Sequence, residues 1–275
     1  MKRIALAVFA FSALAASGCD DKKTESTNTP STTAVPANTP ANTPSAVPAA
    51  APTAAPAAAA PAAGPAQSIK GTVAFTGAAP AVAPQNRAAD PYCNKTKAND
   101  ESIVVNGNKT LKNVYVRITS GITGALPPPP TEKITIEQHE CNYRPRMQGV
   151  VAGQTIEVKN GDQTLHNVHT YKGTTTLFNQ AQIAGSAPID KIVKDDMAML
   201  KFKCDVHPWM TGFIGVQNHP WFAVTGDDGS FELKNVPPGN YKLEAWHEKF
   251  GTKSVDVVVA DKAAEAKFAF DGTEK

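Results

Sequence analysis

Two separate stretches of the chain hold residue types that together can bind a soft metal ion. Cys204, His207 and Met210 lie in the segment CDVHPWM (residues 204–210), which follows an alternating, strand-like run. His166 lies upstream in LHNVH (residues 165–169). A thiolate and two imidazoles give a trigonal plane that suits both Cu(I) and Cu(II), and a weak thioether tunes the potential. The set therefore predicts one copper ion, with zinc as the main competitor because Cys and His also bind zinc.

Each of these residues taken alone is ordinary, since a buried thiol, a strand-end histidine and a core methionine are common. Their joint order and spacing carry the prediction. The C-x-x-H-P-[aromatic]-M loop and the H-N-V-H element resemble the cupredoxin family, and within it the amicyanin-like proteins, over residues 131–217. The resemblance implies a type 1 (blue) copper site in a Greek-key β-sandwich. It assigns the ligands His166, Cys204, His207 and Met210, makes Asn167 the tie between the two ligand stretches, and leaves His169 outside the ligand set.

The ligand loop departs from the family at Val206, where amicyanin-like proteins have proline. Val206 keeps an N–H group that proline lacks, so we expect different hydrogen bonding near the thiolate and a different potential. Pro208, Trp209 and Phe213 surround the His207 end of the loop. Trp209 and Phe213 can form an apolar docking face for electron exchange and can also cap the sandwich core, since the two roles are compatible.

The pattern favours electron transfer over an enzyme reaction. Lys203 and Asp205 flank Cys204, where a multicopper oxidase needs histidines, and a binuclear CuA loop needs two cysteines. We expect cycling between Cu(I) and Cu(II) with redox partners such as a c-type cytochrome or a periplasmic dehydrogenase or reductase. The alternatives are a copper-binding or delivery protein, and an envelope interaction module without a redox role.

A second set of motifs lies on both sides of the cupredoxin-like segment. The patterns T-x-x-x-G-x-F (residues 225–231) and V-P-x-G-x-Y (residues 236–241) resemble the carboxypeptidase regulatory-like (transthyretin-like) β-sandwich family. Its usual opening, I-x-G-x-V, stands far upstream at residues 69–73. We therefore expect residues 68–120 to pair with residues 218–270, which would nest the cupredoxin inside the second sandwich; two modules in series are the alternative.

Period-2 alternation and Gly, Pro and Asn turn signals predict an all-β protein of two sandwiches, the second smaller. We predict N-terminal strands over 67–130, the cupredoxin over 131–217 and the second sandwich over 218–275. His219, Trp246 and His247 of that sandwich could contact the copper loop, but the two histidines are more often structural. After loss of Lys2 and Arg3 the chain holds 25 basic and 25 acidic residues, which disfavours nucleic-acid binding.

The N-terminus predicts export. Residues 1–19 combine a basic start, a short apolar run and small residues before Cys19, which resembles a bacterial lipoprotein signal ending at a lipidated cysteine. Residues 20–66 hold nine prolines and no aromatic residue, so we expect a disordered tether with no core. The expected location is the periplasmic face of a bacterial envelope, with the membrane reached through the lipid anchor only.

Two of the four cysteines have no role assigned by the motifs above. Cys19 is assigned to lipid and Cys204 to copper, so Cys93 and Cys141 remain in an oxidising compartment. We predict a Cys93–Cys141 disulfide. The alternatives are two free thiols, or a second metal site that uses Cys141.

Overall fold

A computed structural model describes residues 64–274. The predicted signal peptide, the lipidated Cys19 and almost all of the predicted tether lie outside the described residues. Apart from one short 3-10 helix, η1 (Cys93–Lys95), the regular elements of the described part are strands, which confirms the all-β fold class. No helix among these residues is long and apolar enough to cross a membrane.

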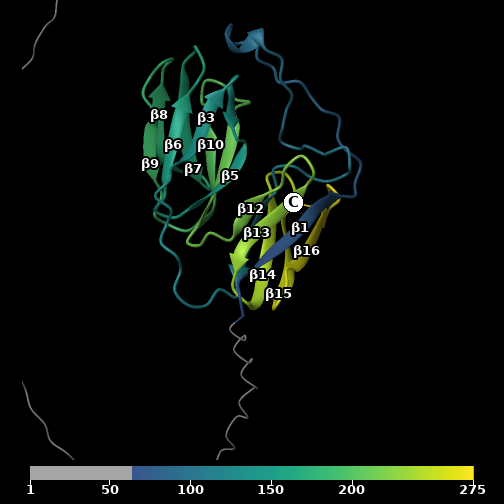
Figure 1. The fold of residues 1–275 in the computed structure, drawn as a ribbon. Coiled ribbons are helices and arrows are strands. Elements are labelled where there is room, and N and C mark those ends of the chain that lie inside the picture. Colours follow the sequence, from purple (N-terminus) through teal and green to yellow (C-terminus); the bar gives the residue numbers. More distant parts are fainter. Residues whose placement is uncertain (1–63, 275) are drawn as a thin grey trace, which may run out of the picture. The chain divides into compact units, whose positions relative to one another are not determined.

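The strands form two sandwiches, which we call central and flanking (Figure 1). The central sandwich has a five-stranded sheet ordered β5-β11-β10-β7-β8 and a four-stranded sheet ordered β4-β3-β6-β9. Its strands are β3 (Ile134–His139), β4 (Asn142–Arg144), β5 (Met147–Val151), β6 (Thr155–Asn160), β7 (His166–Lys172), β8 (Thr175–Gln182), β9 (Ile189–Ile192), β10 (Met197–Lys203) and β11 (Thr211–Gln217).

Alternating side chains build the core of the central sandwich. In β6, Ile156 and Val158 are buried, and in β10 Leu200 and Phe202 are buried while their neighbours are partly exposed. These residues pack in one apolar cluster with Ile136 of β3. A half-buried sheet requires this period of two. In the five-stranded sheet, β10 pairs antiparallel with β7, which brings the two ligand-bearing stretches together.

The flanking sandwich has sheets ordered β13-β1-β16 and β12-β2-β14-β15. Its strands are β1 (Gln67–Phe75), β2 (Tyr115–Ser120), β12 (Phe222–Val224), β13 (Ser230–Val236), β14 (Gly239–His247), β15 (Gly251–Val259) and β16 (Ala264–Phe270). Strand β1 lies between β13 and β16, with Ile69 opposite Leu233 on one side and Ala264 on the other. Strand β2 pairs with β12 and β14. The flanking sandwich is therefore built from segments that precede and follow the central sandwich in the sequence.

The connection between β1 and β2 does not serve the flanking sandwich alone. Cys93 in η1 belongs to the apolar cluster of the central sandwich and forms a disulfide with Cys141. The prediction assigned residues 67–130 to N-terminal strands. In the structure, β1 and β2 of this range belong to the flanking sandwich, and η1 between them lies at the ligand-bearing end of the central sandwich.

Candidate metal centre

The turn between β6 and β7 positions the first candidate ligand. Asn160, at the end of β6, donates its side-chain amide to the carbonyl oxygens of Thr164 and Gln182, at 3.0 and 2.8 Å. Its side-chain oxygen accepts the Asp162 N–H at 3.0 Å. This fixed turn delivers His166 as the first residue of β7, fully buried.

The loop between β10 and β11 positions the other ligands. The Cys204 N–H donates to the carbonyl oxygen of Met210 at 3.3 Å, and the Met210 N–H donates to that of His207 at 2.9 Å. The loop therefore closes on itself between two paired strands. The Tyr143 hydroxyl lies 3.0 Å from the carbonyl oxygens of both Asn167 and Lys203, and so links β7 to β10 beside the loop.

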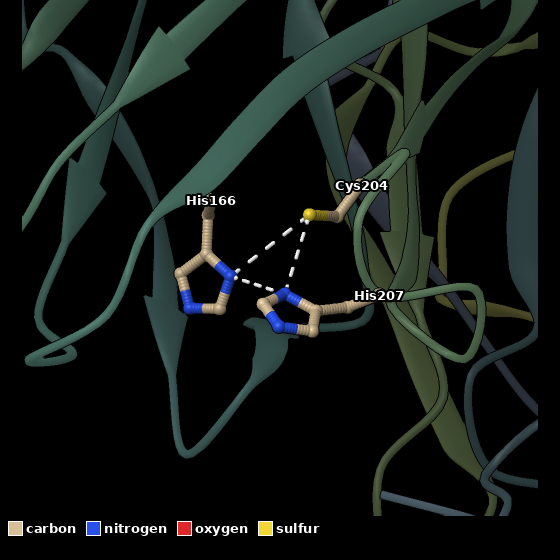
Figure 2. Close-up of side chains that lie close together, drawn as sticks. All are labelled: His166, Cys204 and His207. Carbon is tan, nitrogen blue, oxygen red and sulfur yellow. Dashed lines mark hydrogen bonds between the residues drawn. The ribbon is translucent and has the colours of Figure 1, made fainter. Parts of the chain in front are cut away.

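Three donor atoms from these two stretches converge (Figure 2). The Nδ1 atoms of His166 and His207 are 2.8 Å apart, and the Cys204 Sγ lies 3.9 Å from the first and 3.5 Å from the second. His166 and Cys204 are 0% exposed and His207 is 2% exposed. Met210 is also fully buried, in the same apolar cluster as Cys204.

Asn167 bridges the two stretches, in the role that the resemblance implies. Its side-chain oxygen accepts the Asp205 N–H at 2.6 Å, and its own N–H points to the Cys204 Sγ at 3.5 Å. The side-chain amide donates to the Asp205 carboxylate at 2.7 Å. His169 lies outside the donor cluster, where its Nδ1 faces the Asp205 carboxylate at 2.9 Å.

The outer nitrogen of each histidine faces a carboxylate. His166 Nε2 lies 2.9 Å from Asp162 Oδ2, and His207 Nε2 lies 3.0 Å from Asp90 Oδ2. A carboxylate only accepts hydrogen bonds, so each Nε2 donates outward and each Nδ1 is the nitrogen that faces the interior. The two Nδ1 atoms and the Cys204 sulfur converge on one buried point. This donor set fits a cation that prefers nitrogen and sulfur.

In the metal-free state, His207 Nδ1 lies 3.5 Å from the Cys204 sulfur, and the pKa values of both groups shift. Burial acts to raise the pKa of the Cys204 thiol, but hydrogen bonds from His207 and from the N–H groups of Asn167 and Val206 outweigh it and lower that pKa. Burial acts to lower the pKa of His207, but its contacts with Cys204 and Asp90 raise it overall. The thiolate, which is the form that binds metals, is therefore favoured.

The two carboxylates stay ionised for the same reason. Burial acts to raise the pKa of Asp90, but hydrogen bonds from the Cys93 backbone and from His207 lower it to about 2. Hydrogen bonds from His166 and the Cys141 backbone likewise hold the pKa of Asp162 below its usual value against the effect of burial.

Neither aspartate belongs to a motif that the sequence predicts as part of the site. Asp162 stands four residues before His166, a spacing that could have drawn attention to it. Asp90 is 117 residues from His207, in a connection without strands, and no local pattern marks it.

The remaining loop residues differ in exposure. Val206 is 51% exposed and Pro208 is exposed, while Trp209 is partly buried and donates its indole N–H to the carbonyl oxygen of Cys141 at 3.0 Å. Phe213 is 6% exposed and packs edge-on against Trp246 of β14, with ring centroids 5.3 Å apart. Of the two roles considered for Phe213, its cover by the flanking sandwich agrees with capping of the core and not with an exposed docking face.

The structure contains the predicted Cys93–Cys141 disulfide, with Cα atoms 5.7 Å apart. Both sulfurs are used in this bond, so neither the free-thiol alternative nor a metal-binding role for the Cys141 thiol applies in this state. Cys204 is the free cysteine of the described residues.

Comparisons with known proteins cover parts of the chain. The second β-sandwich domain of NOMO1-like BOS complex subunits matches residues 218–270, which form most of the flanking sandwich. No curated protein matches the chain.

Among solved structures, a purple cupredoxin from Nitrosopumilus maritimus is 20% identical over 30% of this chain and 98% of its own, with a TM-score of 0.27. A copper(I) form of an amicyanin variant is 20% identical to this chain, and the match covers 31% of this chain and 82% of amicyanin, with a TM-score of 0.28. A copper-containing nitrite reductase from Thermus scotoductus is 18% identical to this chain, and the match covers 36% of this chain and 25% of the reductase, with a TM-score of 0.28. Likeness at this level carries no argument about function, so the case for a metal centre rests on its geometry.

Proposed function

We propose that the protein binds one copper ion through His166, Cys204, His207 and Met210 and carries single electrons. The observation that supports this most is the convergence of two imidazole Nδ1 atoms and one sulfur at a buried point. Copper bound by these donors supplies a one-electron couple between Cu(I) and Cu(II).

The fourth residue and the burial favour copper over zinc. Structural zinc sites use Cys, His and carboxylate ligands in a closed tetrahedron. The carboxylates here contact the outer nitrogens of the histidines and so are engaged elsewhere. Met210, which is buried in the same apolar cluster as Cys204, offers a thioether, which structural zinc sites do not use and copper sites do.

Rigidity favours an electron carrier over a delivery protein. Each imidazole is held from outside by a carboxylate, and Cys204 is held by the backbone N–H groups of Asn167 in β7 and Val206 in the loop. Ligands fixed in this way change little between oxidation states. A delivery protein must also hand its metal to a partner through exchangeable ligands, and these three are at most 2% exposed.

The proposed partners are small redox proteins, such as a c-type cytochrome or a periplasmic dehydrogenase or reductase. With Phe213 covered and His207 buried, the apolar surface next to the ligands is provided by Leu165 and Val206, which are 44% and 51% exposed. Each directly precedes a ligand histidine in the chain. Lipid attachment at Cys19, on the periplasmic face of a bacterial membrane, is part of the same proposal.

Voltammetry of the full chain loaded with one equivalent of copper tests the proposal. We expect a reversible one-electron wave, and electron exchange with a c-type cytochrome observed by stopped flow. His169→Gln is the matched control, because this histidine lies on the same strand as His166 but outside the donor cluster. Copper that binds without any redox wave would instead support a binding or delivery role.

A further inference from the structure

A second layer of contacts joins both candidate ligand histidines to the disulfide. Asp90 accepts the N–H of Cys93 at 2.8 Å, and Asp162 accepts the N–H of Cys141 at 2.8 Å. The same two carboxylates accept from His207 and His166, respectively. The backbone of each disulfide cysteine therefore donates a hydrogen bond to one aspartate, and each aspartate accepts a hydrogen bond from one candidate ligand histidine.

Asp90 is the more unusual member, because it comes from the connection between β1 and β2 and not from the central sandwich. Its Oδ1 accepts the N–H groups of Tyr92 and Cys93 at 2.7 and 2.8 Å. Its Oδ2 accepts the Thr164 hydroxyl at 3.1 Å and the His207 Nε2–H at 3.0 Å. With four donors around it, this carboxylate cannot turn away from His207.

The same segment covers the outer edge of His207. The Cys93 Sγ lies 3.6 Å from His207 Nε2, and the Trp209 ring lies beside the imidazole with centroids 5.1 Å apart. The indole of Trp209 is in turn fixed to the Cys141 carbonyl. The disulfide, the indole and the carboxylate together leave His207 2% exposed.

We propose that Asp90, locked in place by the Cys93–Cys141 disulfide, is a positioning residue that keeps His207 turned with Nδ1 inward and sets the reduction potential of the centre. This inference rests on the proposed function. A carboxylate on the outer nitrogen fixes the tautomer and the ring orientation and makes the imidazole a stronger donor. A stronger donor and a nearby negative charge favour Cu(II) over Cu(I), so Asp90 lowers the potential.

A purely structural role for Asp90 predicts something different. Its contacts with the N–H groups of Tyr92 and Cys93 could serve only to start η1. In that case loss of the charge would change stability and leave the potential alone. The potential of the copper-loaded protein therefore separates the two roles.

The experiment compares Asp90→Asn with Asp100→Asn in the copper-loaded full chain. Asp100 is the matched control, because it lies in the same connection and accepts the Ser102 N–H at 2.7 Å, but has no contact with the ligands. We expect Asp90→Asn to change the ratio of Cu(II) to Cu(I) affinity by about tenfold, which raises the potential by about 59 mV. We expect Asp100→Asn to match the wild type.

Thr164→Val keeps the inference testable if Asp90→Asn does not fold. Removal of the hydroxyl leaves the Asp90 charge in place and frees its Oδ2 to bind His207 more strongly. We expect a smaller shift of the potential in the opposite direction, downward.

Equal potentials in the wild type and in each folded variant of Asp90 and Thr164 would overturn the inference and leave the proposed function standing. A wild type that shows no copper redox couple would overturn both.

Discussion

The two sandwiches each bury two histidines, yet only one pair forms a site. In the flanking sandwich and its entry, His219 and His247 are 3% and 1% exposed. His219 Nε2–H donates to the carbonyl oxygen of Ile118 at 3.1 Å, and His247 Nδ1 accepts the Lys249 N–H at 3.2 Å. In the central sandwich, both outer nitrogens face carboxylates and both inner nitrogens face Cys204.

The difference shows that partners, and not burial, make a histidine available to a metal. Burial lowers the pKa of His219 and lowers that of His247 to about 4, so both stay neutral and structural. His207 is also buried, but its contacts with Cys204 and Asp90 raise its pKa against that effect. A carboxylate behind the ring and a thiol in front of it distinguish the candidate ligand from the core residue.

The largest expected effect separates the two histidine pairs directly. Cys204→Ser removes the soft donor, and we expect it to weaken copper binding by more than the roughly 10–100-fold that loss of an outer-sphere partner costs. His219→Gln should leave copper affinity unchanged. Competition titrations with a chromophoric copper chelator measure both. Equal affinities in the two variants would show that the thiol is not a ligand.

The disulfide is the next test, because it ties a connection of the flanking sandwich to the central one. Its cysteines are 48 residues apart. Loop-closure entropy predicts a loss of about 4 kcal/mol of unfolding free energy for Cys93→Ala with Cys141→Ala. Urea unfolding of the metal-free protein measures this loss. A change below about 1 kcal/mol would mean that the connection is held without the disulfide.

The structural histidines should respond to acid. An unfolded histidine has a pKa of about 6.5, whereas burial lowers that of His247 to about 4. Between these values the unfolded chain binds a proton that the folded chain does not, so stability falls as the pH falls from about 6.5 to about 4.

We expect His247→Gln to remove up to roughly 3 kcal/mol of this pH-dependent loss. His139→Gln, at an exposed position, is the control. Unfolding curves at several pH values provide the measurement. Parallel stability–pH profiles for the wild type and His247→Gln would contradict the prediction.

The smallest expected effect concerns the loop itself. The Val206 N–H contributes a hydrogen bond to the Cys204 thiolate. Val206→Pro removes it, which makes the sulfur a stronger donor and favours Cu(II). We expect the potential to fall by less than about 59 mV, the value for a tenfold change in a one-electron couple. Identical potentials would remove any role for this N–H group.

The sequence predicted what depends on local pattern. Alternation predicted an all-β chain and the strand before Cys204, which is β10, and ligand spacing identified His166, Cys204 and His207, which the structure brings to one point. The motif I-x-G-x-V led to β1, which pairs with strands more than 150 residues later. These features follow from period-two burial and from chemistry carried within a few residues.

What the sequence did not predict depends on contacts between distant segments. Asp90 reaches His207 from an irregular connection, where no periodicity applies. Phe213 lies near His207 in the sequence, and that position alone did not decide between a docking face and a cap of the sandwich core. In β11, however, six consecutive residues are buried, since the flanking sandwich covers the face that would otherwise meet solvent. The sequence of a single strand does not show whether another sandwich will cover its outer face.

The most direct test of the account is the combined visible and electron paramagnetic resonance spectrum of the full chain after addition of one equivalent of Cu(II). The account predicts an intense visible band from a thiolate–copper bond and loss of reactivity of the Cys204 thiol, both absent in Cys204→Ser. A colourless complex in which that thiol still reacts freely would contradict it.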